Sequence, residues 1–136
     1  MVLLDTCASI WLFEQQPMSA ASLEAIRFAA GIARVLISPV SAWEIGLLAR
    51  RPRGTLAFQP SPYDWFTDLL ALPGMRLTPL SFRAAIAASY LPGQLHGDPA
   101  DRLLIASARE LGVPLVTRDR RILDYAAQGH VEAIAC

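Results

Sequence analysis

Five acidic side chains stand where short apolar segments give way to candidate helices: Asp5, Glu44, Asp98, Asp101 and Asp119. Two carboxylates about 5 Å apart repel each other by roughly 3 kcal/mol at an effective dielectric constant of about 20. If several of these acids converge, they need a bound cation or raised pKa values. Carboxylate oxygens suit Mg²⁺ or Mn²⁺, and such an ion binds phosphate oxygens and acidifies its bound water. The pattern therefore indicates metal-assisted hydrolysis of a phosphodiester.

Each acid also has a simpler interpretation. Asp5 and Asp98 are of the type that commonly caps a helix, and Pro99 follows the second of them, as at many helix starts. Glu44 completes a capping box that begins at Ser41. Asp101 lies in the first turn of a candidate helix, where an acid interacts favourably with the helix dipole. Asp119 could simply lie in a turn. The metal-site hypothesis therefore depends on the acids meeting in one place.

The elements that must position these acids alternate as short apolar segments and helical patterns. Strands are expected over residues 2–4, 35–38, 75–80, 113–117 and 131–135. Helices are expected after Asp5 and over residues 19–33, 41–50, 63–72, 81–90, 98–111 and 121–127. This alternation predicts an α/β fold in one domain, residues 1–136, with a central, mostly parallel β-sheet flanked by helices on both faces. Sites in such sheets form beyond the carboxyl ends of the strands, where the acids fall.

Composition limits the classes of protein that fit. The 136 residues suffice for about one domain, and no apolar run reaches the roughly 20 residues of a membrane-spanning helix. Two cysteines without metal-site spacing argue against a disulfide framework or structural zinc and fit a reducing cytoplasm. Twelve basic residues balance twelve acidic ones, so net charge gives no sign of nucleic-acid binding. Hydrophobic residues form 54% of the chain, and this excess favours a subunit or partner interface.

Four segments together resemble the acidic motifs of PIN-domain nucleases, and among these the VapC-type toxins of bacterial toxin–antitoxin pairs. The segments are Leu3–Thr6, Ser38–Ile45, His96–Ala106 and Leu115–Asp119. Their order and spacing cover nearly the whole chain. The resemblance implies that the catalytic, metal-binding acids are Asp5, Glu44, Asp101 and Asp119. It leaves Asp98, Thr6 and Thr117 as accessory residues of the site.

The same resemblance implies an endoribonuclease that depends on Mg²⁺ or Mn²⁺ and forms a homodimer. Its partners are an RNA substrate and a cognate antitoxin, a DNA-binding protein that wraps the toxin with an apolar helix and often points an arginine into the acidic site. Two arginine clusters are candidate contacts to RNA phosphates, although solvated surface arginines are equally consistent with the sequence: Arg50, Arg51, Arg53, Arg118, Arg120 and Arg121.

The sequence leaves more than one role open for a proline-rich segment, for His96 and for the tryptophans. Residues 51–62 hold three prolines and a glycine, so a loop or small projecting clip is expected there. His96 is a candidate general acid, but its glycine-flanked loop favours a structural or surface role. The tryptophans are more typical of core or interface anchors than of base-stacking platforms.

Two rival functions also place acids at strand ends. A phosphatase of the haloacid-dehalogenase type needs a second Asp two residues after the first, where this chain has Cys7. A response-regulator receiver needs a late lysine, and the chain contains no lysine. A PIN scaffold that binds RNA or protein without catalysis stays possible, although retention of all four acids argues against it.

Overall fold

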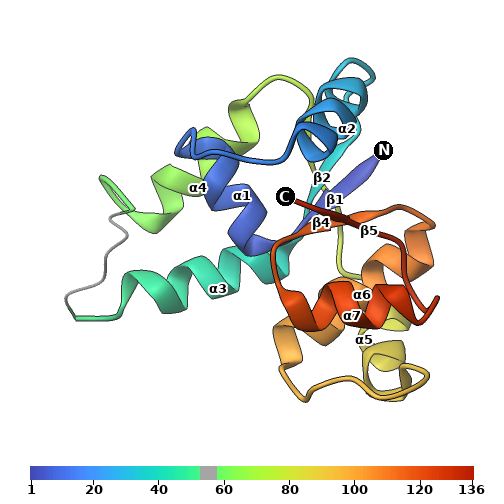
Figure 1. The fold of residues 1–136 in the computed structure, drawn as a ribbon. Coiled ribbons are helices and arrows are strands. Elements are labelled where there is room, and N and C mark those ends of the chain that lie inside the picture. Colours follow the sequence, from blue (N-terminus) through green and yellow to red (C-terminus); the bar gives the residue numbers. More distant parts are fainter. Residues whose placement is uncertain (53–57) are drawn as a thin grey trace.

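A five-stranded parallel sheet lies at the centre of the computed structural model, which describes residues 1–52 and 58–136 (Figure 1). The strand order is β3-β2-β1-β4-β5, and every neighbouring pair runs parallel. The strands are β1 (Val2–Leu4), β2 (Val35–Ile37), β3 (Met75–Leu77), β4 (Leu115–Thr117) and β5 (Ala133–Ala135). The predicted central, mostly parallel sheet is therefore confirmed.

Helices connect the strands and cover both faces of the sheet, as predicted. They are α1 (Thr6–Phe13), α2 (Ala20–Ala30), α3 (Pro39–Ala49), α4 (Pro62–Ala71), α5 (Phe82–Ala87), the 3₁₀ helix η1 (Ala88–Tyr90), α6 (Pro99–Leu111) and α7 (Arg120–Ala127). In the parts of the chain that the structure describes, none of them is long and apolar enough to cross a membrane.

Alternating side chains of the strands build two separate cores. Val2 and Leu4 point to one face and pack with apolar side chains of α1, α2 and α4. Leu3 points to the other face and packs with apolar side chains of α6 and α7. Strands buried on both faces explain why the sequence shows continuous apolar runs rather than alternation with polar residues.

The predicted start of α3 is wrong. The helix begins at Pro39, and the Ser38 hydroxyl accepts a hydrogen bond from the backbone N–H of Val40. A proline at the first helical position has no N–H to leave unpaired and already holds a helical φ angle. Glu44 consequently lies in the second turn of α3, and it does not take part in a capping box with Ser41.

Several predicted elements are longer than the observed ones. The predicted strands at 75–80, 113–117 and 131–135 each shrink to three residues, and the predicted helix at 81–90 divides into α5 and η1. Val113 and Val131 are buried although neither belongs to a strand. The apolar pattern therefore marks burial, which extends beyond the hydrogen-bonded ladder. Of the expected clip at 51–62, residues 53–57, including Arg53, lie outside the described residues.

Candidate active site

The five acids predicted from the sequence line one pocket of about 210 Å³ at the carboxyl ends of β1, β2 and β4. Its walls are formed by Asp5, Thr6, Cys7, Glu44, Asp98, Asp101, Leu104, Asp119 and Arg121. The pocket lies where α1, α3, α6 and α7 begin. Parallel strands bring three of these segments together, because β1, β2 and β4 are each followed closely by a helix, and α6 packs against α3 and β4 beside them.

Asp5 ends β1 and caps α1. Its Oδ1 accepts a hydrogen bond from the backbone N–H of Ala8 at 2.7 Å, and its Oδ2 accepts one from the Thr117 hydroxyl. Only 5% of the residue is exposed. Burial raises the pKa of Asp5 to about 6, against the effect of these two hydrogen bonds, and repulsion from Asp101 and Glu44 raises it further. The helix-cap and active-site interpretations of Asp5 are thus compatible.

Glu44 reaches the pocket from α3. Its Oε1 accepts a hydrogen bond from the Thr6 hydroxyl, which also lies 3.1 Å from the Ser41 hydroxyl oxygen. Partial burial raises the pKa of the Glu44 carboxyl, while the bond from Thr6 opposes this rise. Thr6 and Thr117 therefore each donate a hydrogen bond to one carboxylate of the pocket, and their accessory role stays a prediction.

Asp101 lies in the first turn of α6, where the Asp98 side chain caps the helix. The backbone N–H of Asp101 donates to Asp98 Oδ1 at 3.1 Å, so the predicted cap is present. Burial raises the pKa of Asp101, and a hydrogen bond with His96 opposes this rise. Asp98 is exposed at the rim of the pocket, whereas 15% of the Asp101 side chain is accessible.

His96 contacts the site directly. Its Nε2 lies 2.7 Å from Asp101 Oδ2, and its buried Nδ1 has no hydrogen-bond partner within residues 1–52 and 58–136. The sequence favoured a structural or surface position, yet only 16% of the side chain is exposed. The glycine-flanked loop gave no sign of this contact, because it depends on how the loop folds back over α6.

Asp119 caps α7 and is paired with Arg121. Its Oδ1 accepts from the backbone N–H of Arg121 at 2.8 Å, and its Oδ2 lies 3.0 Å from Arg121 Nη2. The same Nη2 lies 3.7 Å from Asp101 Oδ2. The hydrogen bond from Arg121 holds the pKa of Asp119 below its usual value. Arg121, predicted as a phosphate contact, thus bridges two acids of the pocket.

The other candidate arginines are dispersed. Arg120 Nε lies 3.5 Å from Asp124 Oδ1 on the exposed face of α7, and Arg118 stacks on Trp11. Arg50 and Arg51 lie at the end of α3, beside two grooves described below. The described arginines of the two clusters therefore lie on different parts of the surface and do not surround the pocket.

Cys7 is a pocket residue that sequence analysis did not select. It follows Thr6 in the first turn of α1, and its side chain is exposed at the pocket. Partial burial raises the pKa of its thiol. The position was predictable, since the first residues of a helix that starts at a strand end face the same edge of the sheet.

The donor chemistry of the pocket suits a hard divalent cation. Carboxylate oxygens dominate its lining, and Asp101 is close enough to Asp5 and Glu44 for its charge to raise the pKa of both. Among the residues that the structure describes, no three acidic, histidine or cysteine side chains form a ready-made metal-binding group. This agrees with the contacts above, because Thr117, Thr6, His96 and Arg121 each engage a carboxylate.

A chain of grooves leads away from the acids along α3. An apolar groove of about 750 Å³ lies between α3 and α4, with Trp43, Leu47, Tyr63 and Phe66 among its walls. A smaller pocket of about 220 Å³ shares Trp43 and Leu47 with this groove and shares Glu44 and Asp98 with the acidic pocket. Apolar and acidic surfaces are therefore continuous along one side of the molecule.

Comparisons with known proteins agree with the fold. A family model of the PIN domain matches residues 2–128. Ribonuclease VapC22 of Mycobacterium tuberculosis is 37% identical over 125 residues, which cover 91% of each chain. The structure of VapBC2 from Rickettsia felis bound to a promoter DNA fragment has a TM-score of 0.71 at 14% identity, covering 100% of this chain and 99% of the other. DNA-bound VapBC from Salmonella typhimurium gives a TM-score of 0.67 at 16% identity, covering 98% and 96%.

Proposed function

Because this chain belongs to the PIN-domain family, we propose that it is an endoribonuclease, the toxin of a toxin–antitoxin pair, that hydrolyses RNA phosphodiester bonds at the acidic pocket. The observation that carries the proposal is the meeting of Asp5, Glu44, Asp101 and Asp119 in one pocket. The similarity of this chain to Ribonuclease VapC22 over most of its length supports the choice of RNA as substrate.

We propose that these four acids hold Mg²⁺ or Mn²⁺. A bound ion of this kind would supply Lewis acidity toward a phosphate oxygen and a water that ionises more readily. Thr117 and Thr6 orient the carboxylates of Asp5 and Glu44 through their hydroxyl groups. His96 fixes the carboxylate of Asp101. Leu104, which is buried, contributes an apolar part of the pocket wall.

Cleavage of a structured RNA by the purified protein tests this function. We expect cleavage with Mg²⁺ or Mn²⁺, none with EDTA, and none for Asp5→Asn or Asp101→Asn at unchanged helical content by circular dichroism. Asp124→Asn is a matched control, because Asp124 lies on the exposed face of α7, 67% accessible. Full activity of Asp101→Asn would refute the role of that residue. RNA binding without cleavage by the wild type would instead support a non-catalytic scaffold.

We further propose that a cognate antitoxin inhibits the enzyme by placing an apolar helix in the groove between α3 and α4. The solved neighbours are VapBC toxin–antitoxin complexes, which supports this kind of partner. The groove continues into the acidic pocket through Trp43 and Glu44, so a cationic side chain next to such a helix could reach the carboxylates. This cationic side chain would pair with the carboxylates and so block the site directly.

We also propose that the enzyme is a homodimer and acts in the cytoplasm. Phe82, Ile86 and Tyr90 follow one another at helical spacing along α5 and η1, and each is more than half exposed. A stripe of this kind is typical of a subunit interface. Light scattering after size-exclusion chromatography distinguishes a dimer of the 14.8 kDa chain from a monomer.

A further inference from the structure

We propose that Arg118, stacked on Trp11, binds the RNA phosphate next to the one that is cleaved. This inference rests on the proposed ribonuclease function and adds a named contact to it. The observations that carry it are the stacking of the Arg118 guanidinium on Trp11, its free positive charge and its place directly before Asp119 of the acidic pocket.

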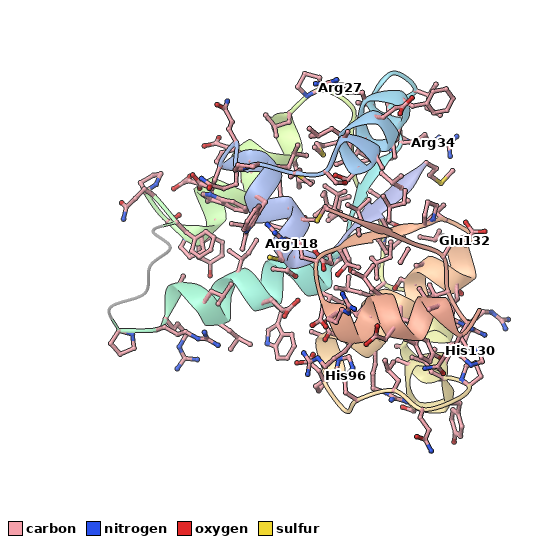
Figure 2. The ribbon with its side chains drawn as sticks, viewed as in Figure 1. Arg27, Arg34, His96, Arg118, His130 and Glu132 are labelled. Atoms are coloured by element: carbon pink, nitrogen blue, oxygen red, sulfur yellow. The ribbon has the colours of Figure 1, made fainter. Side chains whose placement is uncertain are left out.

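Stacking fixes the orientation of Arg118. The residue lies between Thr117 and Asp119, directly after β4, and Figure 2 shows it beside helix α1. Its guanidinium carbon lies 3.4 Å from the centroid of the Trp11 ring. A cation over an indole face gains a favourable electrostatic interaction, and the planar guanidinium loses its rotational freedom before any ligand arrives.

The charge of Arg118 is not neutralised by a neighbouring acid. No carboxylate of residues 1–52 or 58–136 forms a salt bridge with it, whereas Arg120 pairs with Asp124 and Arg121 pairs with Asp119. Arg118 is also exposed to solvent. Of the three arginines in this cluster, it is the one whose charge is left for an anionic ligand.

Helix α1 connects the ring that holds Arg118 to the acidic pocket. Cys7 lines the pocket, and Trp11 lies four residues further on, so both occupy the same face of α1 about one turn, roughly 5.4 Å, apart. Arg118 is close enough to Cys7 and Cys136 for its positive charge to oppose the rise in the pKa of both thiols. A step of one helical turn is comparable to the separation of successive phosphates in an extended RNA strand. A strand whose scissile phosphate lies at the acids can therefore place its neighbouring phosphate at Arg118.

The ligand favoured by this geometry is a phosphate of RNA rather than a carboxylate of the antitoxin. Any RNA in the acidic pocket brings flanking phosphates with it, and a guanidinium offers two parallel N–H donors to phosphate oxygens. The proposed antitoxin groove follows α3 and α4, whereas Arg118 lies against α1.

Binding of a fluorescein-labelled single-stranded oligouridylate tests the proposal without cleavage. The full-length Asp101→Asn protein serves as parent, and fluorescence anisotropy is measured across a range of salt concentrations. We expect Arg118→Gln to weaken binding by about three- to tenfold and to reduce the slope of log K against log salt by about 0.7, as for one lost phosphate contact of a single strand. Arg118→Lys should restore the slope but only part of the affinity, because lysine keeps the charge and loses the stacked plane.

Arg83→Gln is the matched control. The Arg83 guanidinium also lies over an aromatic ring, 5.3 Å from the centroid of Phe82, but it belongs to α5 on a different part of the molecule. Equal losses for Arg118→Gln and Arg83→Gln, or unchanged binding for both, would overturn the inference. Unchanged binding together with RNA cleavage by the wild type would leave the ribonuclease function standing. A single methylphosphonate linkage that weakens binding to the parent but not to Arg118→Gln would identify the contacted phosphate.

Discussion

Asp5 uses its two carboxylate oxygens for two different purposes. One oxygen caps α1, and the other accepts a hydrogen bond from Thr117 across the sheet. The same side chain is almost fully buried beside two further acids. Such an arrangement costs stability in the absence of a cation, and a cost of this kind is typical of functional sites.

Asp5→Asn should therefore stabilise the metal-free protein at neutral pH. The pKa of Asp5 rises from 3.8 to about 6 on folding, so the folded state binds a proton more tightly than the unfolded state. The stabilising contribution of this group is complete below about pH 4 and is lost as the pH rises through about 6, by about 3 kcal/mol at most. Urea unfolding in EDTA should show the Asp5→Asn variant to be more stable than the wild type at about pH 7.5, with a difference that shrinks toward about pH 5. A difference independent of pH would contradict this account.

Arg121 supplies an internal positive charge to Asp119 and Asp101. Removing it as Arg121→Gln should increase the affinity for Mn²⁺ about two- to fivefold in the absence of RNA, because an exposed ion pair contributes up to about 1 kcal/mol. Isothermal titration calorimetry measures this change. Arg120→Gln, which affects only an exposed pair with Asp124, should leave the affinity unchanged. Weaker Mn²⁺ binding by Arg121→Gln would show that the arginine supports the site rather than competes for it.

At the scale of elements, four helices begin at the pocket and present their positive dipole ends to it. Their caps are Asp5, Ser38, Asp98 and Asp119, and each cap is confirmed by a side-chain hydrogen bond. Because three of these caps are acids of the pocket, capping and metal binding were indistinguishable in the sequence. The structure shows that a single residue can both cap a helix and line the pocket.

Asp98 allows the capping role and the metal-binding role to be separated. Asp98→Ser keeps a side-chain oxygen for the backbone N–H of Asp101, so we expect unchanged stability and activity if capping is its only role. Asp98→Ala should lower the free energy of unfolding by about 1 kcal/mol. Urea denaturation and RNA cleavage, measured on both variants, make the comparison. Loss of activity in the serine variant would instead assign the carboxylate to the metal site.

The order of strand, acid and helix was predictable because apolar runs, caps and breakers are local signals. The strand pattern gave the parallel sheet, and parallel strands place their carboxyl ends together, so the convergence of Asp5, Glu44 and Asp119 followed. The start of α3 was missed because Ser41 to Glu44 imitates a capping box while Pro39 begins the helix. The contacts of His96 could not be predicted, since they depend on the path of a loop and on side-chain packing between elements.

At the scale of the whole molecule, the acidic pocket adjoins two different surfaces. One is the apolar groove of α3 and α4, and the other carries Arg118, which stacks on Trp11 of α1. Antitoxin and RNA would therefore both contact the acids, but the antitoxin would also bind the groove and the RNA would also bind Arg118. This separation makes it possible to change the affinity for one without changing the affinity for the other.

Tyr63→Glu tests that separation. Tyr63 is 86% exposed in the apolar groove, so the variant should fold normally and cleave RNA as the wild type does. A buried charge in the groove should weaken antitoxin binding by about tenfold or more, measured by surface plasmon resonance. Phe28→Glu is the control, because Phe28 is 74% exposed on α2 and lies outside the groove. Equal effects of the two variants on the antitoxin would place its docking surface elsewhere.

The sheet order has a consequence for folding. β1 lies between β2 and β4, and the Asp5 carboxylate receives its hydrogen bond from Thr117, 112 positions further along the chain. The pocket is therefore incomplete until β4 has joined the sheet. We expect ribonuclease activity to appear late during refolding from urea, after the β1–β2 pair has formed.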